Sequence, residues 1–303
     1  MDTFRALHLF TRVIELGSFT AAAREAGLGQ PALSKAIAGL EQSLGVRLLA
    51  RTTSGLSPTD EGRRFYARGR EIVEDYQEAV ADVRGRTRQL TGTLRVNAPL
   101  GLGELRLGTL ALAFLKDNPN IALELVLNDR MVDLIEEGMD VAVRLGHPPP
   151  PDAVAREVAY SPRLLVASPA YLQGAARLEA PEDLAAHEYL WFAGLRPDNV
   201  LEFARNGKTA KIEAHGRFRV NSSLALRQAL VQGAGLGSAP AWLVGDLLET
   251  GDLVRLLPDW TLPGQALHLV YPSRRYLPLR VRAFLQFMAE RLPALPGFEQ
   301  PAR

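Results

Sequence analysis

The sequence predicts an α/β protein made of a small helical N-terminal unit, one long amphipathic helix and a C-terminal α/β region. Short helical patterns separated by glycines fill the first sixty residues. Apolar residues then recur at alternating intervals of four and three from position 65 to position 83, and strand and helix patterns alternate after position 92. A chain of 303 residues has room for two or three domains.

The N-terminal segment has the pattern of three short helices. Helical spacing of apolar residues over 4–14 predicts the first helix, the alanine-rich run 21–26 predicts the second, and a stripe from Leu33 to Leu44 predicts the third. A glycine turn at 27–29 separates the last two helices, and Pro31 suits a first helical turn. Helix, turn and helix on this scale indicate a helix-turn-helix, whose second helix presents its exposed face to the DNA major groove.

A two-stranded wing and a long helix are expected next. Residues 48–52 and 56–57 flank a polar turn, and a strong helix start follows at 57–61. The heptad-like seam of the long helix favours pairing with a second copy, although the helix can instead pack on the core of its own domain. The predicted dimerisation residues on this seam are Phe65, Ile72, Tyr76, Ala79 and Val83.

The remaining chain has the pattern of alternating strands and helices that is typical of a two-lobed α/β fold. Strands are expected at 93–97, 121–127 and 140–145, with helices at about 103–117 and 131–138 between them. After the prolines at 148–151, a strand at 164–167 begins a second set that includes a hairpin turn at Asn206-Gly207. A strand at 267–271 and a helix near 278–292 are assigned to the first lobe by analogy with two-lobed ligand-binding folds.

Composition excludes several classes of protein. The chain has no cysteine, which rules out disulfides, thiolate zinc sites and a cysteine nucleophile. Its 35 basic and 34 acidic residues leave a net charge of +1, which by itself does not indicate a nucleic-acid binder. Because there is no apolar run of membrane-spanning length and no signal-peptide core, we expect a cytoplasmic protein with no membrane partner.

Sequence motifs give little support to an enzyme. Glycine pairs at 101–103 and 233–235 lack the third glycine of a dinucleotide loop, and neither a phosphate-loop lysine motif nor a Gly-x-Ser-x-Gly elbow is present. The five histidines are scattered singly, without metal-ligand spacing. We therefore expect no catalytic residues, no metal and no cofactor.

The first ninety residues resemble the LysR-type transcriptional regulators. The match consists of Leu9-Phe10, Gly17-Ser18-Phe19, Ala21-Ala22-Ala23, Gln30-Pro31-Ala32-Leu33-Ser34-Lys35, Leu40-Glu41, Leu44-Gly45-Val46-Arg47-Leu48, Arg51-Thr52 and Thr59-Asp60-Glu61-Gly62. A weaker collinear resemblance continues through Gly92-Thr93-Leu94-Arg95-Val96, Asp140-Val141-Ala142-Val143-Arg144-Leu145-Gly146, Ala167-Ser168-Pro169-Ala170-Tyr171-Leu172 and Gly233-Ala234-Gly235-Leu236-Gly237.

The resemblance implies a three-part regulator. It implies a winged helix-turn-helix at 1–58, a coiled-coil linker and dimerisation helix at 59–90, and a periplasmic-binding-protein-like α/β effector domain at 91–303. Lobe I of this domain would span about 91–161 and 266–303, and lobe II about 162–265. The implied function is sequence-specific binding to promoter operators in double-stranded DNA by a homodimer or homotetramer, controlled by a small-molecule effector in the cleft between the lobes. RNA polymerase is a further expected partner.

Residues expected to contact DNA lie on the third helix, the wing and the start of the second helix. Glutamine can bond adenine, lysine can reach guanine or phosphate, small apolar groups can meet a thymine methyl, and hydroxyls can donate to phosphate. The alternative for each is an ordinary solvated surface. The expected DNA-binding residues are Ser18, Thr20, Gln30, Pro31, Ala32, Ser34, Lys35, Arg51, Thr52 and Thr53.

Residues expected to contact the effector lie at helix starts and after strands, because ligands of open α/β sheets bind beyond the carboxyl ends of strands. Plain helix capping or an internal ion pair is the alternative for each. The expected effector-binding residues are Pro99, Leu100, Gly101, Leu102, Asn128, Asp129, Arg144, Gly146, Asn221 and Ser222.

Some positions depart from the pattern of the family. Ala36, Ala38 and Gly39 replace polar or basic residues that are common on the recognition helix, which implies fewer phosphate contacts. Leu100 and Leu102 occupy a loop in which many members carry serine or threonine. This second departure leaves open a DNA-binding regulator with a ligand-insensitive effector domain. An enzyme or transport-type binding protein built on the two-lobed part is a third alternative, against which the missing catalytic motifs and export signal weigh.

Overall fold

The computed structural model of the chain describes residues 2–52, 55–83, 90–130, 133–135, 137–146, 153–193, 199–273 and 277–301. The chain folds into two compact units. Unit 1 comprises Met1–Gly92, Asp133–Gly138 and Tyr276–Arg280, and unit 2 comprises Thr93–Val132, Met139–Arg275 and Val281–Arg303. No helix in the described ranges is both long and apolar enough to cross a membrane.

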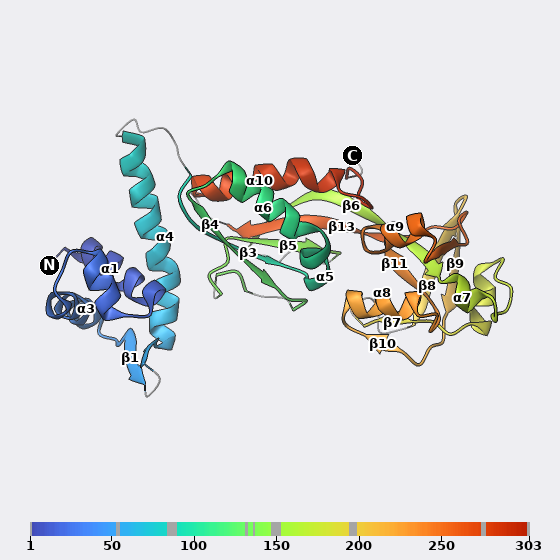
Figure 1. Ribbon diagram of the computed structural model, residues 1–303, viewed down its shortest axis with the longest axis horizontal. Helices are drawn as coiled ribbons and strands as arrows, with labels where there is room; N and C mark the ends of the chain where they lie inside the picture. Colours follow the sequence, from blue (N-terminus) through green and yellow to red (C-terminus); the bar gives the residue numbers. More distant parts are fainter. Residues whose placement is uncertain are drawn as a thin grey trace. The chain divides into compact units, whose positions relative to one another are not determined.

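Unit 1 begins with the three expected helices, which are α1 (Thr3–Leu16), α2 (Phe19–Glu25) and α3 (Gln30–Leu44) (Figure 1). Asp2 caps α1 by accepting the Phe4 N–H at 3.0 Å, and Ser18 caps α2 by accepting the Ala21 N–H at 3.2 Å. Gly17 and Gly45 end α1 and α3 with φ values of 59° and 73°, a conformation that glycine adopts without steric cost.

The wing and the long helix follow. β1 (Leu49–Thr52) pairs antiparallel with β2 (Gly55–Pro58), and α4 (Asp60–Val83) begins directly afterwards. The side chain of Thr59 caps α4 by accepting the Gly62 N–H at 2.9 Å. The expected wing and linker helix are therefore confirmed as elements of the fold.

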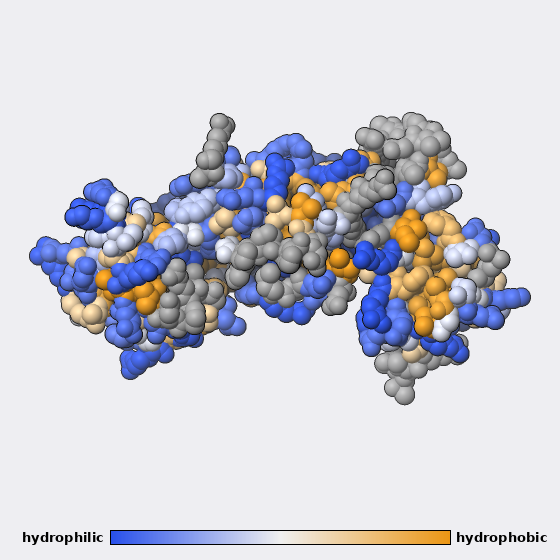
Figure 2. Space-filling view, turned by 180° about the vertical axis from the view of Figure 1, so that it is seen from behind, coloured by the Kyte–Doolittle hydropathy of each residue, from blue (hydrophilic) through white to orange (hydrophobic). Residues whose placement is uncertain are grey.

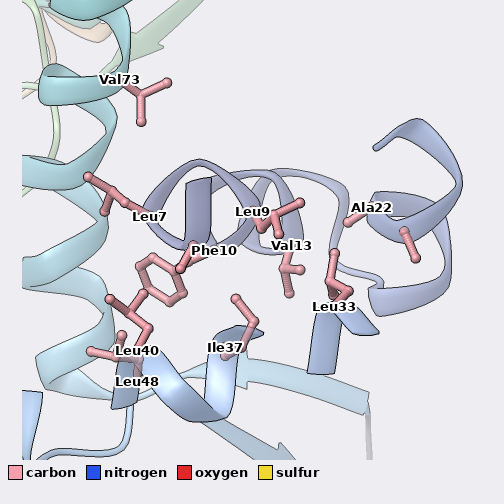
Figure 3. Packing of buried hydrophobic residues seen from close by; sticks show 12 residues of the cluster. Leu7, Leu9, Phe10, Val13, Ala22, Leu33, Ile37, Leu40, Leu48 and Val73 are labelled. Carbon is pink, nitrogen blue, oxygen red and sulfur yellow. The ribbon is translucent and has the colours of Figure 1, made fainter. Parts of the chain in front are cut away.

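Leu48 lies at the edge of the core of unit 1, beside Leu40 (Figure 3). Leu48 is fully buried among the apolar faces of α1 and α3, which include Phe10 and Leu40. Its carbonyl accepts the Thr59 N–H at 3.0 Å. A Cβ added at Gly62 would lie 1.9 Å from that carbonyl oxygen, so α4 approaches the backbone at Leu48 as closely as only glycine allows.

Unit 2 is built on a seven-stranded mixed sheet in the order β11-β6-β13-β5-β3-β4, with β12 also paired to β6. Its strands are β3 (Gly92–Ala98), β4 (Ile121–Leu127), β5 (Val141–Leu145), β6 (Ala153–Ala167), β11 (Leu236–Pro240), β12 (Val254–Leu256) and β13 (Leu262–Pro272). The long antiparallel strands β6 and β13 continue from the half of the sheet that contains β3 and β5 to the half that contains β11 (Figure 1). They connect the two lobes.

Helices cover the first lobe. α5 (Leu100–Leu102), a π-helical segment (Gly103–Leu107) and α6 (Gly108–Asp117) run on from one another, and α10 (Leu279–Arg291) precedes a final 3-10 turn (Leu292–Ala294). α6 and α10 pack side by side, because the Phe114 ring meets the rings of Phe284 and Phe287 edge-on at centroid distances of 5.2 Å. α10, near the end of the chain, therefore packs beside α6.

The second lobe contains smaller elements around its own core. These are α7 (Pro169–Leu172), a 3-10 turn (Pro181–Ala186), β7 (Trp191–Phe192), β8 (Val200–Arg205), β9 (Lys208–Glu213), β10 (Arg219–Val220), α8 (Ser223–Val231) and α9 (Ala241–Thr250). β7 pairs parallel with β10. β8 and β9 form the hairpin expected at Asn206-Gly207, where φ is 48° and 75°, respectively. The buried core includes Leu165, Tyr189 and Phe203.

Two expectations for the C-terminal region differ from the structure. The helix expected at about 131–138 is reduced to turns in its described residues, 133–135 and 137–138. The Asp133 carboxylate accepts the Ile135 N–H at 2.8 Å and the Asp133 carbonyl accepts the Glu137 N–H at 3.1 Å, but Gly138, with a φ of 62°, ends the turn at once. The strand expected at 164–167 is only the last part of β6, which begins at Ala153. Residues 148–151 lie outside the described residues.

We predict that Gly62→Ala destabilises unit 1. The added methyl group would clash with the backbone carbonyl of Leu48. Removing the clash requires the wing or α4 to shift, which should lower the free energy of unfolding by about 1–3 kcal/mol. Urea unfolding followed by helical circular dichroism measures the change. Gly245→Ala in α9 is the matched control, because its Cβ meets nothing within 4 Å and alanine should be neutral or stabilising. Equal effects of both substitutions would contradict the close approach.

Candidate DNA-binding surface and effector site

The two sides of α3 differ sharply in burial. Leu33, Ile37 and Leu40 lie in the core, with exposed fractions of 0%, 3% and 1%. On the other side, Gln30, Pro31, Ala32 and Lys35 are exposed and Ser34 is half-buried. The structure therefore places the predicted α3 residues on a common exposed surface, centred on the first two turns of the helix.

Helix starts supply backbone donors next to this surface. In the first turn of α3, Pro31 has no N–H and the Ala32 N–H donates to the Gly29 carbonyl at 3.0 Å, so backbone donation to a ligand is limited to the Gln30 N–H. Such a group, together with the helix dipole, favours a phosphate oxygen. At the start of α2, the Ser18 hydroxyl oxygen already accepts the Ala21 N–H, which leaves its own hydrogen to donate, and Thr20 is exposed.

An ion pair holds α2 to α1. The Arg12 guanidinium contacts both carboxylate oxygens of Glu25, with Nε–Oε1 at 2.6 Å and Nη2–Oε2 at 2.8 Å, and it also pairs with Glu15. The hydrogen bonds from Arg12 lower the pKa of Glu25. Both side chains are partly exposed, so we expect the pair to orient α2 more than to stabilise the unit.

The wing is held to α3 by a buried carboxylate. Glu41, in the last turn of α3 and 8% exposed, accepts the Leu48 N–H at 2.8 Å and the Leu49 N–H at 3.1 Å. Its other oxygen faces Arg47 at 3.4 Å. Glu41 therefore sets the position of β1 relative to the exposed surface of α3. The sequence reasoning missed this role, although an acidic residue beside the apolar stripe was its signal.

The predicted wing contacts are only partly described. Arg51 and Thr52 lie in the last two positions of β1, but their side chains are outside the described structure, and Thr53 lies outside it altogether. The backbone register pairs Arg51 with Leu56 and Thr52 with Gly55. Both predicted residues are thus at the tip of the wing.

The seam of α4 divides into an inward and an outward part. Phe65 packs on the core of unit 1, with its ring centroid 5.6 Å from that of Phe10. Ile72 and Tyr76 are 54% and 55% exposed, and the Tyr76 ring lies 4.4 Å from the Phe4 ring. Figure 2 shows hydrophobic residues gathered on one face of unit 1, at the right of the view. The side chains of Ala79 and Val83 are outside the described structure.

In unit 2, the starts of α5 and α8 lie against each other. Pro99 precedes α5, and the Leu100 N–H donates to the Asp129 carboxylate at 3.1 Å. A Cβ at Gly101 would lie 2.2 Å from the Ser223 hydroxyl of α8. The structure therefore brings together the helix starts of the two lobes, with Asp129 already bonded to one of them. Leu102 is fully buried.

The other predicted effector residues lie at strand ends and at the α8 cap. Asn128 is half-buried, and its Oδ1 has no hydrogen-bond partner among the described residues. Arg144 is 7% exposed and donates to the Val143 carbonyl at 3.1 Å. The Gly146 N–H donates to Ala266 at 2.9 Å. Ser222 caps α8 by accepting the Ala225 N–H at 3.3 Å, and Asn221 before it is exposed.

The ranges that the structure describes contain no cluster of three or more histidine, aspartate or glutamate side chains suited to a metal ion.

Two family models match the chain. Residues 4–63 match the bacterial regulatory helix-turn-helix protein, lysR family, and residues 87–293 match the LysR substrate binding domain. The transcriptional regulator PtxR of Pseudomonas aeruginosa is 34% identical over 96% of this chain and 93% of its own length.

Solved structures agree in fold over nearly the whole chain. CrgA, a LysR-type transcriptional regulator from Neisseria meningitidis, is 30% identical with a TM-score of 0.61, over 95% of this chain and 98% of that one. The Vibrio cholerae virulence activator AphB is 28% identical with a TM-score of 0.59, over 94% of this chain and 98% of that one.

We predict that Glu41→Gln weakens both the wing and DNA binding. The substitution keeps the shape but removes the charge that accepts two backbone N–H groups in a buried site, at a cost of about 1–3 kcal/mol in unfolding free energy. Urea unfolding and operator titration measure the two effects. The matched control is Glu61→Gln at an exposed position in the first turn of α4, which should change the free energy of unfolding by less than about 1 kcal/mol. Equal stability of the two variants would refute the role of Glu41.

Proposed function

The chain belongs to the LysR family of bacterial transcriptional regulators, and on this premise we propose that it binds specific operators as a homo-oligomer under the control of a small-molecule effector. Its relatives are named transcriptional regulators, so the chain is a regulator and not an enzyme. The observation that carries the proposal is the exposed polar surface of α3, held rigidly by the core beneath it and by Glu41.

Recognition of the operator is assigned to α3 and its surroundings. Gln30 suits a bidentate bond to adenine, Lys35 suits guanine acceptors or phosphate, and Pro31 and Ala32 suit a thymine methyl. Ser34 adds a hydroxyl beside them. Ser18, Thr20 and the wing residues Arg51, Thr52 and Thr53 are proposed to hold phosphates, which fix register without reading sequence.

Dimerisation is assigned to the exposed part of α4. Ile72 and Tyr76 lie one helical turn apart and are more than half exposed, which is unusual for large apolar side chains unless a partner covers them. Pairing with the same face of a second copy would present two α3 helices to half-sites about one DNA turn, or a multiple of it, apart. Phe65, Ala79 and Val83 extend this seam in the proposal, and a tetramer would pair two such dimers.

Effector control is assigned to unit 2. A ligand held between the helix starts of the two lobes would favour one lobe arrangement over another, and paired chains would convert this difference into a change of DNA-binding geometry. Pro99, Leu100, Gly101, Leu102, Asn128, Asp129, Arg144, Gly146, Asn221 and Ser222 are the proposed contacts. Contact with RNA polymerase would complete the regulatory output.

A ligand-insensitive effector domain is the second candidate. It is favoured by the contacts at the helix starts, where the Asp129 carboxylate bonds the Leu100 N–H and Gly101 lies against Ser223. The burial of Leu102 also favours this candidate, because its side chain packs in the protein interior and is not available to contact a ligand. Metabolite titrations that leave both thermal stability and operator affinity unchanged would favour this candidate.

We predict that Gln30→Ala and Lys35→Ala each weaken operator binding by about 1–3 kcal/mol and leave the fold intact. Both side chains are exposed, so no packing is lost. Titration of each variant against operator and unrelated DNA measures the effect. Gln42→Ala, an exposed position near the other end of α3, is the matched control and should keep wild-type affinity. Unchanged affinity in both test variants would rule out α3 as the reading element.

We predict that Ile72→Asp converts the oligomer to monomers at micromolar concentration. A carboxylate buried against its counterpart in a dimer would lack a partner, whereas in the single chain it remains in water. Sedimentation velocity measures the change. Gln77→Asp places the same charge on an exposed, off-seam position of α4 and should leave the oligomer intact. An undissociated Ile72→Asp variant would refute the proposed seam.

A further inference from the structure

An arginine is buried on the strand that connects the two lobes without an acidic partner. Arg163 of β6 is 9% exposed, and within the described part of the chain it forms no ion pair. Its Nη1 donates to the Ser238 carbonyl of β11 at 3.2 Å and its Nη2 to Gln265 Oε1 of β13 at 3.4 Å. Its Nε is buried and has no hydrogen-bond partner among the residues that the structure describes.

Such an arrangement is costly for the ligand-free protein. Burial lowers the pKa of the Arg163 guanidinium, while the nearby Tyr189 and Tyr160 hydroxyls favour its charged form. An arginine stays protonated in proteins, so burial leaves a cation whose desolvation is only partly offset by two neutral acceptors. Stability alone does not account for keeping a charge in this place.

The unsatisfied edge matches a carboxylate. Nε and Nη2 lie on the same side of the guanidinium, and this pair can donate two parallel hydrogen bonds to one carboxylate. Nε is unpaired, and the bond from Nη2 to Gln265 is long at 3.4 Å. An incoming carboxylate would therefore have to displace only the long hydrogen bond between Nη2 and Gln265.

The strand beside Arg163 is irregular. β13 carries one extra residue between Leu262, which pairs with Arg163, and Gln265, which pairs with Ser161. Bulges of this kind redirect side chains and are frequent next to binding sites. Gln265 also lies against the end of β5, since a Cβ at Gly146 would be 3.3 Å from its Cβ. Gln265 therefore lies between Arg163 and the end of β5, where an effector is expected.

Aromatic groups adjoin the same place. The Tyr189 hydroxyl donates to Ser238 Oγ at 2.7 Å, and the Tyr189 ring lies 4.4 Å from the Trp191 ring. The Tyr189 side chain thus adjoins Ser238, whose carbonyl accepts from Arg163, and it brings apolar ring surface near the guanidinium. Apolar ring surface near a cation suits a small organic molecule better than an inorganic ion.

We infer that Arg163 is an effector-binding residue and that the effector is a small organic carboxylate, which supplies the ion-pair partner that the described residues do not provide. This inference rests on the proposed effector control of the chain. Because Nε is buried, an anion reaches it only when the surrounding strands or lobes separate, which ties occupancy of the site to the arrangement of the lobes.

The first test is thermal unfolding of the full-length protein without ligand. Arg163→Met removes the unpaired charge and keeps the length of the side chain, so we expect a melting temperature equal to or above that of the wild type. Arg156→Met, at an exposed position of the same strand, is the matched control and should be neutral. A melting temperature of Arg163→Met several degrees below that of the wild type would make Arg163 a structural residue and overturn the inference.

The second test adds ligands. Acetate, pyruvate, succinate and benzoate are compared with acetamide and benzamide at about 10 mM and constant ionic strength, where a bound ligand raises the melting temperature by a few degrees. At least one carboxylate should stabilise the wild type and Arg156→Met, but not Arg163→Met, and its amide should have no effect. Equal shifts in Arg163→Met, or no shift of the wild type by any carboxylate, would overturn the inference.

A second variant tests the same site with Arg163 retained. Gln265→Glu places a carboxylate within reach of Arg163, so it should raise the melting temperature and abolish the response to added carboxylates. An undiminished response in Gln265→Glu would count against the site. If only an amine or a neutral sugar changes operator affinity, the carboxylate inference fails and the proposed effector control stands.

Discussion

The backbone at Leu48 is the constraint on which the DNA-binding unit depends. The N–H of this residue is bonded to Glu41 of α3, its carbonyl to Thr59 at the start of α4, and its side chain fills the core between α1 and α3. Gly62 allows α4 to pass directly over it. One residue thus joins α3, the wing and α4. A displacement of α4 by a second copy would therefore be transmitted to the wing through covalent and hydrogen-bonded neighbours.

In the second unit, the corresponding constraint is the pairing of the two long strands β6 and β13. β6 and β13 are paired along most of their length; β13 also pairs with β5 of the first lobe, and β6 also pairs with β11 and β12 of the second. A continuous pair of strands restricts the relative motion of the lobes to bending and twisting of the sheet, which is a suitable basis for two discrete arrangements. Arg163 and the bulge in β13 lie on this pair. The inferred carboxylate would therefore act where the lobes are joined.

Much of the fold is predictable from local patterns. Apolar spacing and glycine stops determine α1, α2 and α3 to within one or two residues, because these signals act within a single helix. The course of β6 is not predictable in this way, since its first half alternates weakly and is stabilised by pairing with β13. The exposed surface of α3 follows from the same spacing as its buried stripe. Glu41 and Arg163 do not follow from any spacing, because their importance depends on partners brought close by the fold.

The most direct test of the account is binding of the purified protein to the DNA upstream of its own coding region, with unrelated competitor DNA, at two salt concentrations. Phosphate contacts alone give an affinity that falls steeply with salt and does not distinguish sequences. The account predicts competitor-resistant binding that weakens with salt but keeps its preference for the operator. Binding that is lost equally to any DNA at both salt concentrations would contradict sequence-specific recognition at this site.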